Sequence, residues 1–484
     1  MTQRSYSTVA MRAWGLSSAT ALACKVVTVA TTAVLARLLV PEDFGVVTMG
    51  VAVVGLVRYV ADLGLGSGVV YVSKGELDGA AGTLAAVSGA LGVLLLWAVA
   101  PAVAEFNREP ALLPIFRVLS FHVLLDSAGG VPRAVLLREL RYKALYATDL
   151  ATEVANAVVS VGLAAAGTGP WALVWGGVAA GSTRLATYLY LTKLRPASPL
   201  SRLRGMREML RYGVASMGTG LATHGYTNAD YIVIGRMLGK GPLGIYNKAF
   251  NAVDFLVQLL SNRVGVILFP VFSAIRDDRK RIVSGLLRSE LGLALAAFPA
   301  FGALAVWAPV MVRIVLGPRW DGVVLPLRAL CVYGVMRALL SPRTSLLYAV
   351  GRPRVDLYLN IGQFVTVVAL AIAGARFGVA GVAVGVSAAW LIYGACSLFA
   401  AAHMAGVPMG RFSLSVGIPA FAGAAFVAAG ILPKWPGPMA VAALLGSAAG
   451  AAAWAIVAWG LRPVLARAGL DPKELLAGTF RRSA

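Results

Sequence analysis

Charged residues are scarce in this sequence. They make up 13% of its 484 residues, whereas soluble proteins are about one quarter charged. Histidine and cysteine are also rare, at three residues each, and the cysteines (Cys24, Cys331 and Cys396) lie in apolar stretches without a C-x-x-C spacing. We therefore expect neither disulfides nor a metal site. Because the G-x-x-x-x-G-K-[S/T] phosphate loop is missing, direct use of ATP is not expected, and neither is any other cofactor.

Long hydrophobic segments make up most of the sequence. Hydrophobic residues account for 59% of the chain, the mean hydropathy is +0.78, and 54 glycines are scattered through the apolar runs. Small residues allow membrane helices to approach closely. The sequence therefore predicts an all-α polytopic membrane protein, since a β-barrel would show short alternating segments instead.

About fourteen segments have the roughly 20 mostly apolar residues that a membrane-spanning helix needs. The predicted spans are 14–39, 44–71, 80–104, 112–137, 143–166, 171–193, 209–238, 244–273, 286–316, 323–349, 355–375, 378–403, 412–432 and 438–461. The first span contains Lys25 and is interpreted as a helix rather than a cleaved signal. Short connecting loops leave no room for an extramembrane domain.

Positive charge is distributed unevenly over these loops. The net charge is +22, and by our count roughly 25 lysines and arginines lie on one side against roughly 5 on the other. This asymmetry predicts cytoplasmic termini, with the basic loops meeting anionic lipid. Nucleic acid is not an expected partner, because no soluble domain could bind it.

Internal similarity indicates a duplication. Arg37 and Gly45 align with Arg236 and Gly244 at an offset of about 199, and the two P-R-x-x-L-L motifs, at Pro132 and Pro342, are about 210 apart. Six helices thus repeat in the same orientation, as two lobes related by an axis along the membrane normal. The predicted divisions are a first lobe at 1–200, a second at 201–405, an added helix pair at 406–465 and a cytoplasmic tail at 466–484.

Several motifs also resemble those of one family. They are L-A-R-L-L-V-P-E-D-F-G at 35–45, A-D-L-G-L-G at 61–66, V-P-R-A-V-L-L-R-E-L-R at 131–141, N-A-D-Y-I-V-I-G-R-M-L-G at 228–239 and L-F-P-V-F-S at 268–273. The sequence resembles bacterial polysaccharide and O-antigen flippases of the multidrug/oligosaccharidyl-lipid/polysaccharide exporter superfamily. The resemblance implies fourteen helices in two lobes and a cationic, water-filled central cavity.

The resemblance further implies a function. It is the movement of an undecaprenyl-pyrophosphate-linked oligosaccharide across the bacterial cytoplasmic (inner) membrane by alternating access, for O-antigen, capsule or exopolysaccharide synthesis. Expected partners are that lipid, membrane lipids, and polysaccharide polymerase and chain-length proteins; a monomer is expected. The alternatives are a lipid II-type flippase, a multidrug or cation-coupled exporter, or a membrane glycan polymerase or ligase. An enzyme is disfavoured because the external loops are short, and a drug-cation exporter because arginine is in excess.

Cations inside the predicted spans are the candidate substrate ligands, because lipid does not hold them. Guanidinium groups suit a pyrophosphate, which they bind through two parallel hydrogen bonds. For Arg133 and Arg343, contact with lipid headgroups is an equal alternative. The candidates are Arg117, Arg328, Arg337, Arg133, Arg343, Lys25 and Lys248.

Three carboxylates and two prolines complete the candidate residues. Asp126, Asp230 and Asp254 are candidates for ion coupling or pairing between lobes, with local ion pairs as the alternative. In particular, Asp126 aligns with Arg337 and is a candidate partner for it across the lobes. Pro132 and Pro342 are candidate hinges or gates, because proline frees a helix carbonyl. Arg58 and Asp62, one turn apart, are expected to pair with each other.

Overall fold

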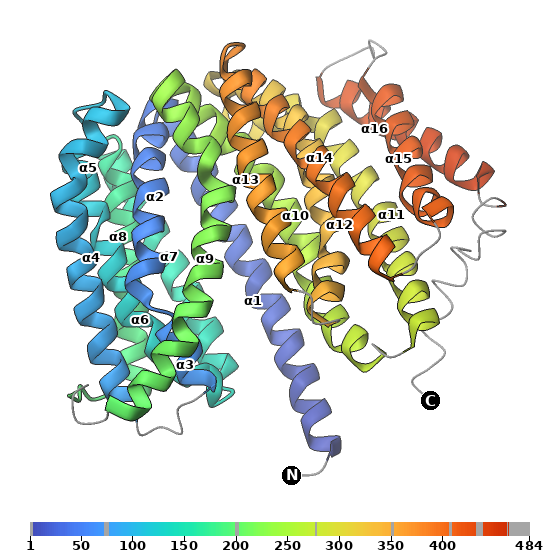
Figure 1. Ribbon diagram of the computed structural model, residues 1–484. Helices are drawn as coiled ribbons and strands as arrows, with labels where there is room; N and C mark the ends of the chain where they lie inside the picture. Colours follow the sequence, from blue (N-terminus) through green and yellow to red (C-terminus); the bar gives the residue numbers. More distant parts are fainter. Residues whose placement is uncertain are drawn as a thin grey trace. The chain divides into compact units, whose positions relative to one another are not determined.

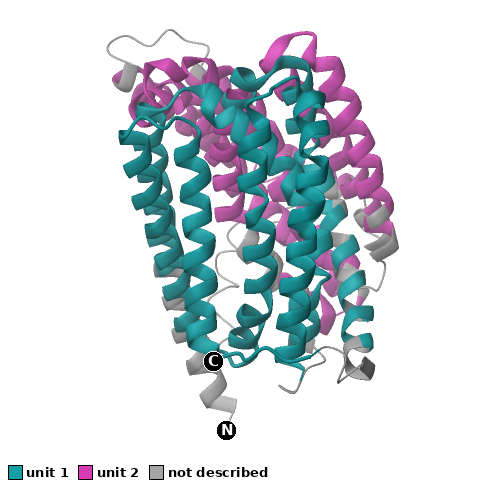
Figure 2. Cartoon of the chain, turned by 90° about the vertical axis from the view of Figure 1, so that its left-hand side faces the viewer, with its two compact units in different colours: residues 1–244 teal, residues 245–484 magenta. Residues whose placement is uncertain are grey.

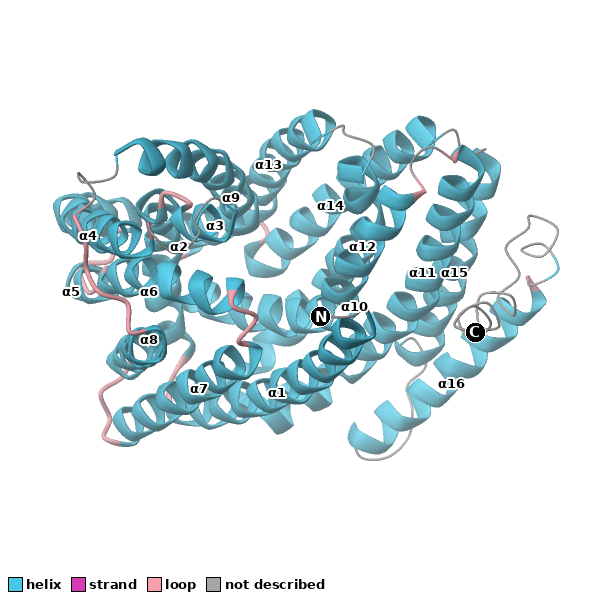
Figure 3. Ribbon diagram, turned by 90° about the horizontal axis from the view of Figure 1, so that it is seen from below, coloured by secondary structure: helices cyan, strands magenta, loops and turns pink. Residues whose placement is uncertain are grey.

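The computed structural model describes most of the chain and shows it to be helical. The described residues are 3–71, 77–198, 203–275, 278–349, 353–405, 409–431, 439–461 and 463, so the expected tail at 466–484 lies outside them. Within these ranges the structure contains α-helices, one π-helical and one 3₁₀ turn, and no strand (Figure 3). The predicted fold class is confirmed.

Sixteen α-helices are described, numbered in chain order (Figure 1). Those of the first half are α1 Gln3–Leu38, α2 Pro41–Asp62, α3 Leu65–Tyr71, α4 Asp78–Asn107, α5 Leu112–Leu119, α6 Phe121–Arg138, α7 Tyr142–Ala165 and α8 Trp171–Thr192. Those of the second half are α9 Leu203–Leu238, α10 Lys240–Ala274, α11 Arg279–Met311, α12 Val324–Ala349, α13 Pro353–Ala375, α14 Gly378–Ala405, α15 Met409–Ile431 and α16 Met439–Gly460. Since α2–α3 and α5–α6 each follow one another within a single predicted span, the helices form fourteen segments.

Ten of the described segments are long and apolar enough to cross a membrane. They comprise α1, α2–α3, α4, α5–α6 and α11 to α16, which makes the protein a multi-pass membrane protein. In α7 and α8 charged residues interrupt the apolar sequence, for example Asp149, Glu153 and Arg184. The places of α7 to α10 in the order nevertheless match the predicted spans.

Two of the predicted spans each consist of two consecutive helices, and the chain bends between the helices of the first, α2 and α3. Between α2 and α3, Leu63 (φ 49°) and Gly64 (φ 63°) adopt the left-handed conformation. This bend brings the backbone of α9 very close, because a Cβ on Gly64 would lie 2.2 Å from the carbonyl oxygen of Gly213. By contrast, α6 and α12 continue as helices through Pro132 and Pro342. This bend therefore lies at Leu63 and Gly64 and not at either proline. The hinge role of Pro132 and Pro342 stays a prediction.

The chain divides into two compact units, residues 1–244 and 245–484 (Figure 2). The sequence placed a division near residue 200, but α9 packs against α2, α3 and α4 and therefore belongs to the first unit. Within the units the helix contacts correspond. The pairs α4·α6, α6·α8 and α7·α8 of the first are matched by α11·α12, α12·α14 and α13·α14 of the second. The matching contacts are those that a duplication of six spans would produce.

The aligned glycines of the repeat meet in space. A Cβ on Gly45 would lie 1.8 Å from the carbonyl oxygen of Lys240, and a Cβ on Gly244 would lie 1.9 Å from that of Pro41. The two contacts are equivalent in the repeat, because Pro41 aligns with Lys240 and Gly45 aligns with Gly244. The segments around Gly45 and Gly244 therefore pack backbone against backbone.

Gly45→Ala is therefore expected to destabilise the protein strongly. The methyl group would overlap a backbone atom, which cannot rotate away, so we expect a cost at or above the usual 1–3 kcal/mol of overpacking. The thermal unfolding midpoint in one detergent should fall for Gly45→Ala and for Gly244→Ala. Gly162→Ala on α7, where a Cβ meets nothing within 4 Å, is the control. Equal midpoints for all three variants would contradict the close approach.

Candidate anion-binding site

The main ionic cluster of the first unit is centred on Asp126. This carboxylate on α6 accepts a hydrogen bond from Arg58 Nη1 on α2 at 3.2 Å and a second from Arg184 Nη2 on α8. The three helices pack against one another, which fixes the three side chains together. Asp126 is 20% exposed, whereas Arg58 and Arg184 are 43% and 34% exposed. Two guanidinium groups therefore share one carboxylate and keep part of their surface free.

Further charges extend this cluster along α6, α7 and α8. Arg133 on α6 is exposed, and it acts electrostatically, together with Arg184, on Asp149 of α7. Arg58 also acts on Asp62, one turn away, but its ion pair is with Asp126 rather than with Asp62. We call Arg58, Arg133, Arg184, Asp126 and Asp149 the α6 cluster. With Asp62 beside Arg58, three cations and three carboxylates lie close together inside predicted membrane spans.

The α6 cluster contains two of the predicted site residues, Asp126 and Arg133. The sequence did not single out Arg184, because its partner Asp126 is 58 residues away and no helical spacing relates such distant positions. The predicted ion pair joined Arg58 to Asp62 on the same helix. In the structure Arg58 pairs instead with Asp126 on another helix. Asp126 itself has its partners within the first unit. Its pairing with Arg337 therefore stays a prediction for another state.

Arg337 has partners of its own in the second unit. Its Nη1 lies 3.3 Å from Asp254 Oδ1, and its guanidinium lies over the rings of Tyr333 and Trp390 at 5.8 and 5.9 Å from their centroids. Asp254 also accepts a hydrogen bond from Gln258 at 2.6 Å. Arg337 and Asp254, both predicted site residues, thus form a local ion pair from α12 and α10.

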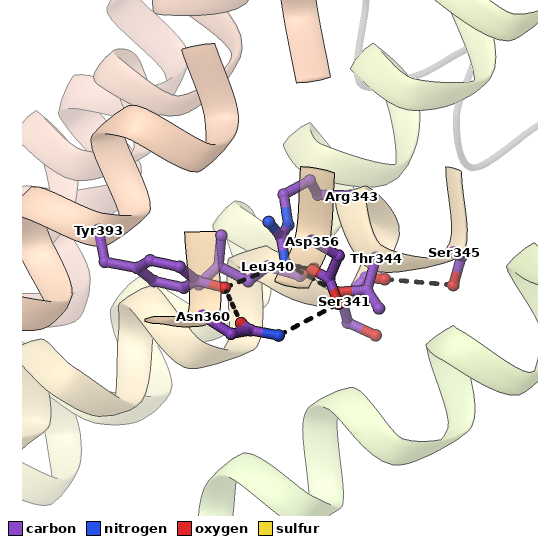
Figure 4. Close-up of polar contacts among 8 residues, drawn as sticks. All are labelled: Leu340, Ser341, Arg343, Thr344, Ser345, Asp356, Asn360 and Tyr393. Atoms are coloured by element: carbon purple, nitrogen blue, oxygen red, sulfur yellow. Dashed lines mark hydrogen bonds and ion pairs between the residues drawn. The ribbon is translucent and has the colours of Figure 1, made fainter. Parts of the chain in front are cut away.

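Arg133 and Arg343, the two arginines of the repeated motif, have different surroundings. Arg133 is exposed, whereas Arg343 is 2% exposed and donates to Asp356 at 2.6 Å (Figure 4). In this state Arg343 therefore contacts neither solvent nor a lipid headgroup. Arg133 has the exposure that either of its two expected roles requires.

The remaining predicted residues lie on five different helices. Arg117 ends α5 and is exposed, and its carbonyl accepts a hydrogen bond from Trp97 at 3.1 Å. Arg328 on α12 donates to the Ala305 carbonyl at 3.0 Å. Asp230 is 2% exposed, and its carboxylate accepts the Tyr231 backbone N–H. Lys25 and Lys248 are half-buried on α1 and α10. Arg117 and Arg328 are equivalent in sequence but differ in exposure.

The first unit also contains a pocket of about 300 Å³, which lies away from these charges. Residues of α2, α4 and α9 line it, and most are apolar, with Asn107 and Tyr231 as exceptions. An apolar lining suits hydrocarbon rather than a phosphate. The α6 cluster, and not this pocket, is therefore the candidate anion-binding site.

Comparison with known proteins identifies the family. The family described as "Polysaccharide biosynthesis protein" matches residues 34–325, which is more than half of the chain. The chain belongs to this polysaccharide biosynthesis protein family. The matched region includes the whole α6 cluster and all five motifs on which the resemblance rested. That resemblance is confirmed.

Relatives within the polysaccharide biosynthesis protein family come from several bacteria. The lipopolysaccharide biosynthesis protein WzxC of Escherichia coli (strain K12) is 26% identical, over 73% of this chain and 72% of its own length. The teichuronic acid biosynthesis protein TuaB of Bacillus subtilis (strain 168) is 28% identical over 57% of each chain. The succinoglycan biosynthesis transport protein ExoT of Rhizobium meliloti (strain 1021) is 27% identical, over 60% of this chain and 59% of its own. The chain thus spans less than two thirds of TuaB and ExoT.

Solved structures show the fold. The lipid II flippase MurJ in an inward closed conformation matches with a TM-score of 0.73 at 12% identity, over 93% of this chain and 99% of that one. An inward-facing MATE family transporter of the MOP superfamily matches with a TM-score of 0.62 at 15% identity, over 79% of this chain and 94% of that one. At such identities the likeness concerns the fold alone. It confirms the fold expected from the resemblance.

Proposed function

We propose that this protein is a flippase that moves an undecaprenyl-pyrophosphate-linked oligosaccharide across the bacterial cytoplasmic membrane, for surface polysaccharide synthesis. In this proposal the α6 cluster binds the pyrophosphate, and the protein exposes it to the two sides of the membrane by alternating access. The protein is a transporter and not an enzyme. Its relatives WzxC, TuaB and ExoT, named for the synthesis of surface glycans, support the class of cargo.

One observation carries the proposal, namely the sharing of Asp126 by Arg58 and Arg184. Cations within membrane spans are costly and face protein or water. Both guanidinium groups keep exposed surface although they share this carboxylate. Exposed guanidinium groups suit an anionic ligand, because their geometry matches phosphate oxygens. A site that presents guanidinium groups disfavours a cationic drug and therefore a multidrug exporter.

A second candidate function is that of a lipid II flippase, which the fold likeness to MurJ favours. Both cargoes carry a pyrophosphate on a lipid, so the α6 cluster would suit either. The proposals differ in what a cell without the protein loses. We expect loss of surface polysaccharide with normal growth, whereas a lipid II flippase would be needed for the cell wall.

Deletion of the gene in its own host tests the proposal. We expect surface polysaccharide to disappear and its lipid-linked precursor to accumulate, with both restored by the wild-type gene on a plasmid. Unchanged surface polysaccharide in the deletion strain would overturn the proposal. Arrested cell-wall synthesis with normal polysaccharide would favour the second candidate. We further propose that both termini lie in the cytoplasm, which the positive charge of the loops supports.

A further inference from the structure

A buried ionic network surrounds Arg343 in the second unit (Figure 4). Its Nη2 donates to Asp356 Oδ1 on α13 at 2.6 Å and to the Tyr393 hydroxyl on α14 at 3.1 Å. Tyr393 donates to Asn360 at 2.8 Å, and the Asn360 amide donates to Asp356 Oδ2 at 3.2 Å. The same guanidinium nitrogen, Nη2, therefore makes both of these hydrogen bonds from Arg343.

The other two nitrogens of this guanidinium are buried without a hydrogen-bond partner. They are Nε and Nη1 of Arg343. Glu290 on α11 is 0% exposed, and both of its carboxyl oxygens also lack a partner. Arg343 is the charged group that acts on Glu290 electrostatically. Two unused donors and two unused acceptors thus lie on two helices that pack against each other, α12 and α11.

The helices packed on α11 bring few other titratable groups to Glu290. These helices are α12, α14, α15 and α16. On α12, Arg337 is paired with Asp254 and Arg328 with the Ala305 carbonyl, while α14 contributes Tyr393 through Arg343. There is no titratable residue on α16, and none among the described side chains of α15. One guanidinium therefore serves two carboxylates, those of Glu290 and Asp356.

The two carboxylates differ in how well they tolerate a charge without Arg343. Asp356 lies in the first turn of α13, where the helix N-terminus favours a negative charge, and it keeps the hydrogen bond from Asn360. Glu290 lies within α11 and has no donor. An isolated buried carboxylate is very costly, so such a group takes up a proton instead. With Arg343 on Asp356, Glu290 is therefore the group that is protonated.

We propose that Glu290 is a proton-binding site and that Arg343 controls its occupancy by moving between Asp356 and Glu290. In the state described here Arg343 pairs with Asp356, and Glu290 holds the proton. When Arg343 turns to Glu290, the O–H bond of Glu290 breaks, the proton passes to water, and the carboxylate accepts the freed guanidinium donors. The role of this exchange in transport rests on the proposed function, but the binding of the proton does not.

The first copy of the repeat differs at both carboxylate positions. At the offset of about 210 that relates Pro132 to Pro342, Glu290 aligns with Ala80 and Asp356 with Tyr146. The carboxylate on which Arg133 acts is instead Asp149, further along α7. A glutamate at the position of Glu290 is therefore a feature of the second copy, although the arginine is repeated.

Infrared spectroscopy of the purified full-length protein in lipid nanodiscs tests this proposal. We expect a protonated-carboxyl C=O band at neutral pH in the wild type and its loss in Glu290→Gln. The control Glu105→Gln, which removes an exposed carboxylate of α4, should leave the band unchanged. A wild type without the band, or a band that survives in Glu290→Gln, would overturn the assignment.

Two further variants test the control by Arg343, and they have opposite expected results. Asp356→Asn removes the competing carboxylate, so Arg343 should pair with Glu290 and the Glu290 band should be lost. Arg343→Met removes the guanidinium, so the band should persist. If the band survives in Asp356→Asn, or is lost in Arg343→Met, the switch is wrong. None of these spectra depends on polysaccharide transport, so failure of the proton site and failure of the flippase proposal are distinguishable.

Discussion

Cells in which Arg58→Ala and Arg184→Ala are combined should lose their surface polysaccharide while the protein remains in the membrane. Each guanidinium is expected to supply a hydrogen bond between charged groups, worth about 1.5–3 kcal/mol. Removing both should therefore weaken pyrophosphate binding by a factor on the order of 10²–10⁴. The readouts are surface polysaccharide and the amount of protein in the membrane fraction.

Two controls separate binding from folding in this experiment. Arg319→Ala combined with Arg376→Ala also removes two arginines, but both are exposed residues outside the α6 cluster, and polysaccharide should stay normal. Adding Asp126→Asn to the Arg58 and Arg184 double variant neutralises the carboxylate left without partners. This triple variant should still lack polysaccharide. Recovery of polysaccharide in it would mean that the arginines only balance the charge of Asp126.

Arg138→Ala should cause the largest loss of stability among single substitutions of charged residues. Arg138, at the end of α6, donates two hydrogen bonds to Asp78, at the start of α4, at 3.0 and 2.6 Å. The Asp78 side chain is 8% exposed, so the substitution takes two charged hydrogen bonds away from a buried carboxylate. Such a break costs about 3–5 kcal/mol, and the first turn of α4 offsets only a small part of it. We expect the unfolding midpoint in detergent to fall by about 3–5 °C.

The neighbouring Glu139 provides a matched control for this ion pair. Glu139 lies 3.6 Å from Arg141, and both side chains are more than 40% exposed, so Glu139→Ala should cost less than about 1 kcal/mol. The combined variant Arg138→Ala and Asp78→Ala should be more stable than Arg138→Ala alone, since it also removes the buried carboxylate that lost these hydrogen bonds. If it is less stable than Arg138→Ala, the pair does not account for the loss.

Hydropathy and the duplication predicted the order of the helices, because both are encoded locally along the chain. The alignment of Gly45 with Gly244 also singled out two positions that lie close together in the structure. The division between the units was not predicted. It depends on α9 packing against α2 and α3, and helix packing of this kind leaves no periodic signal in one sequence.

The candidate site could be predicted only in part, for the same reason. Asp126 was a candidate, but its partners Arg58 and Arg184 are 68 and 58 residues away and share no helical spacing with it. The contrast between Arg133 and Arg343 did have a signal. Comparing the two copies shows Tyr146 where the second copy has Asp356, so Arg133 lacks a carboxylate at the position that pairs with Arg343. The repeat predicts backbone positions, whereas side-chain environments follow from the residues that differ.

Transport by the purified protein tests the central claim most directly. Wild-type protein is placed in liposomes that contain a fluorescent undecaprenyl-pyrophosphate oligosaccharide, and the fraction of label that an added membrane-impermeant quencher can reach is followed over time. We predict that label moves between leaflets with the wild type and that the variant carrying Arg58→Ala and Arg184→Ala resembles protein-free liposomes. Wild-type liposomes that move no more label than protein-free ones would contradict the account.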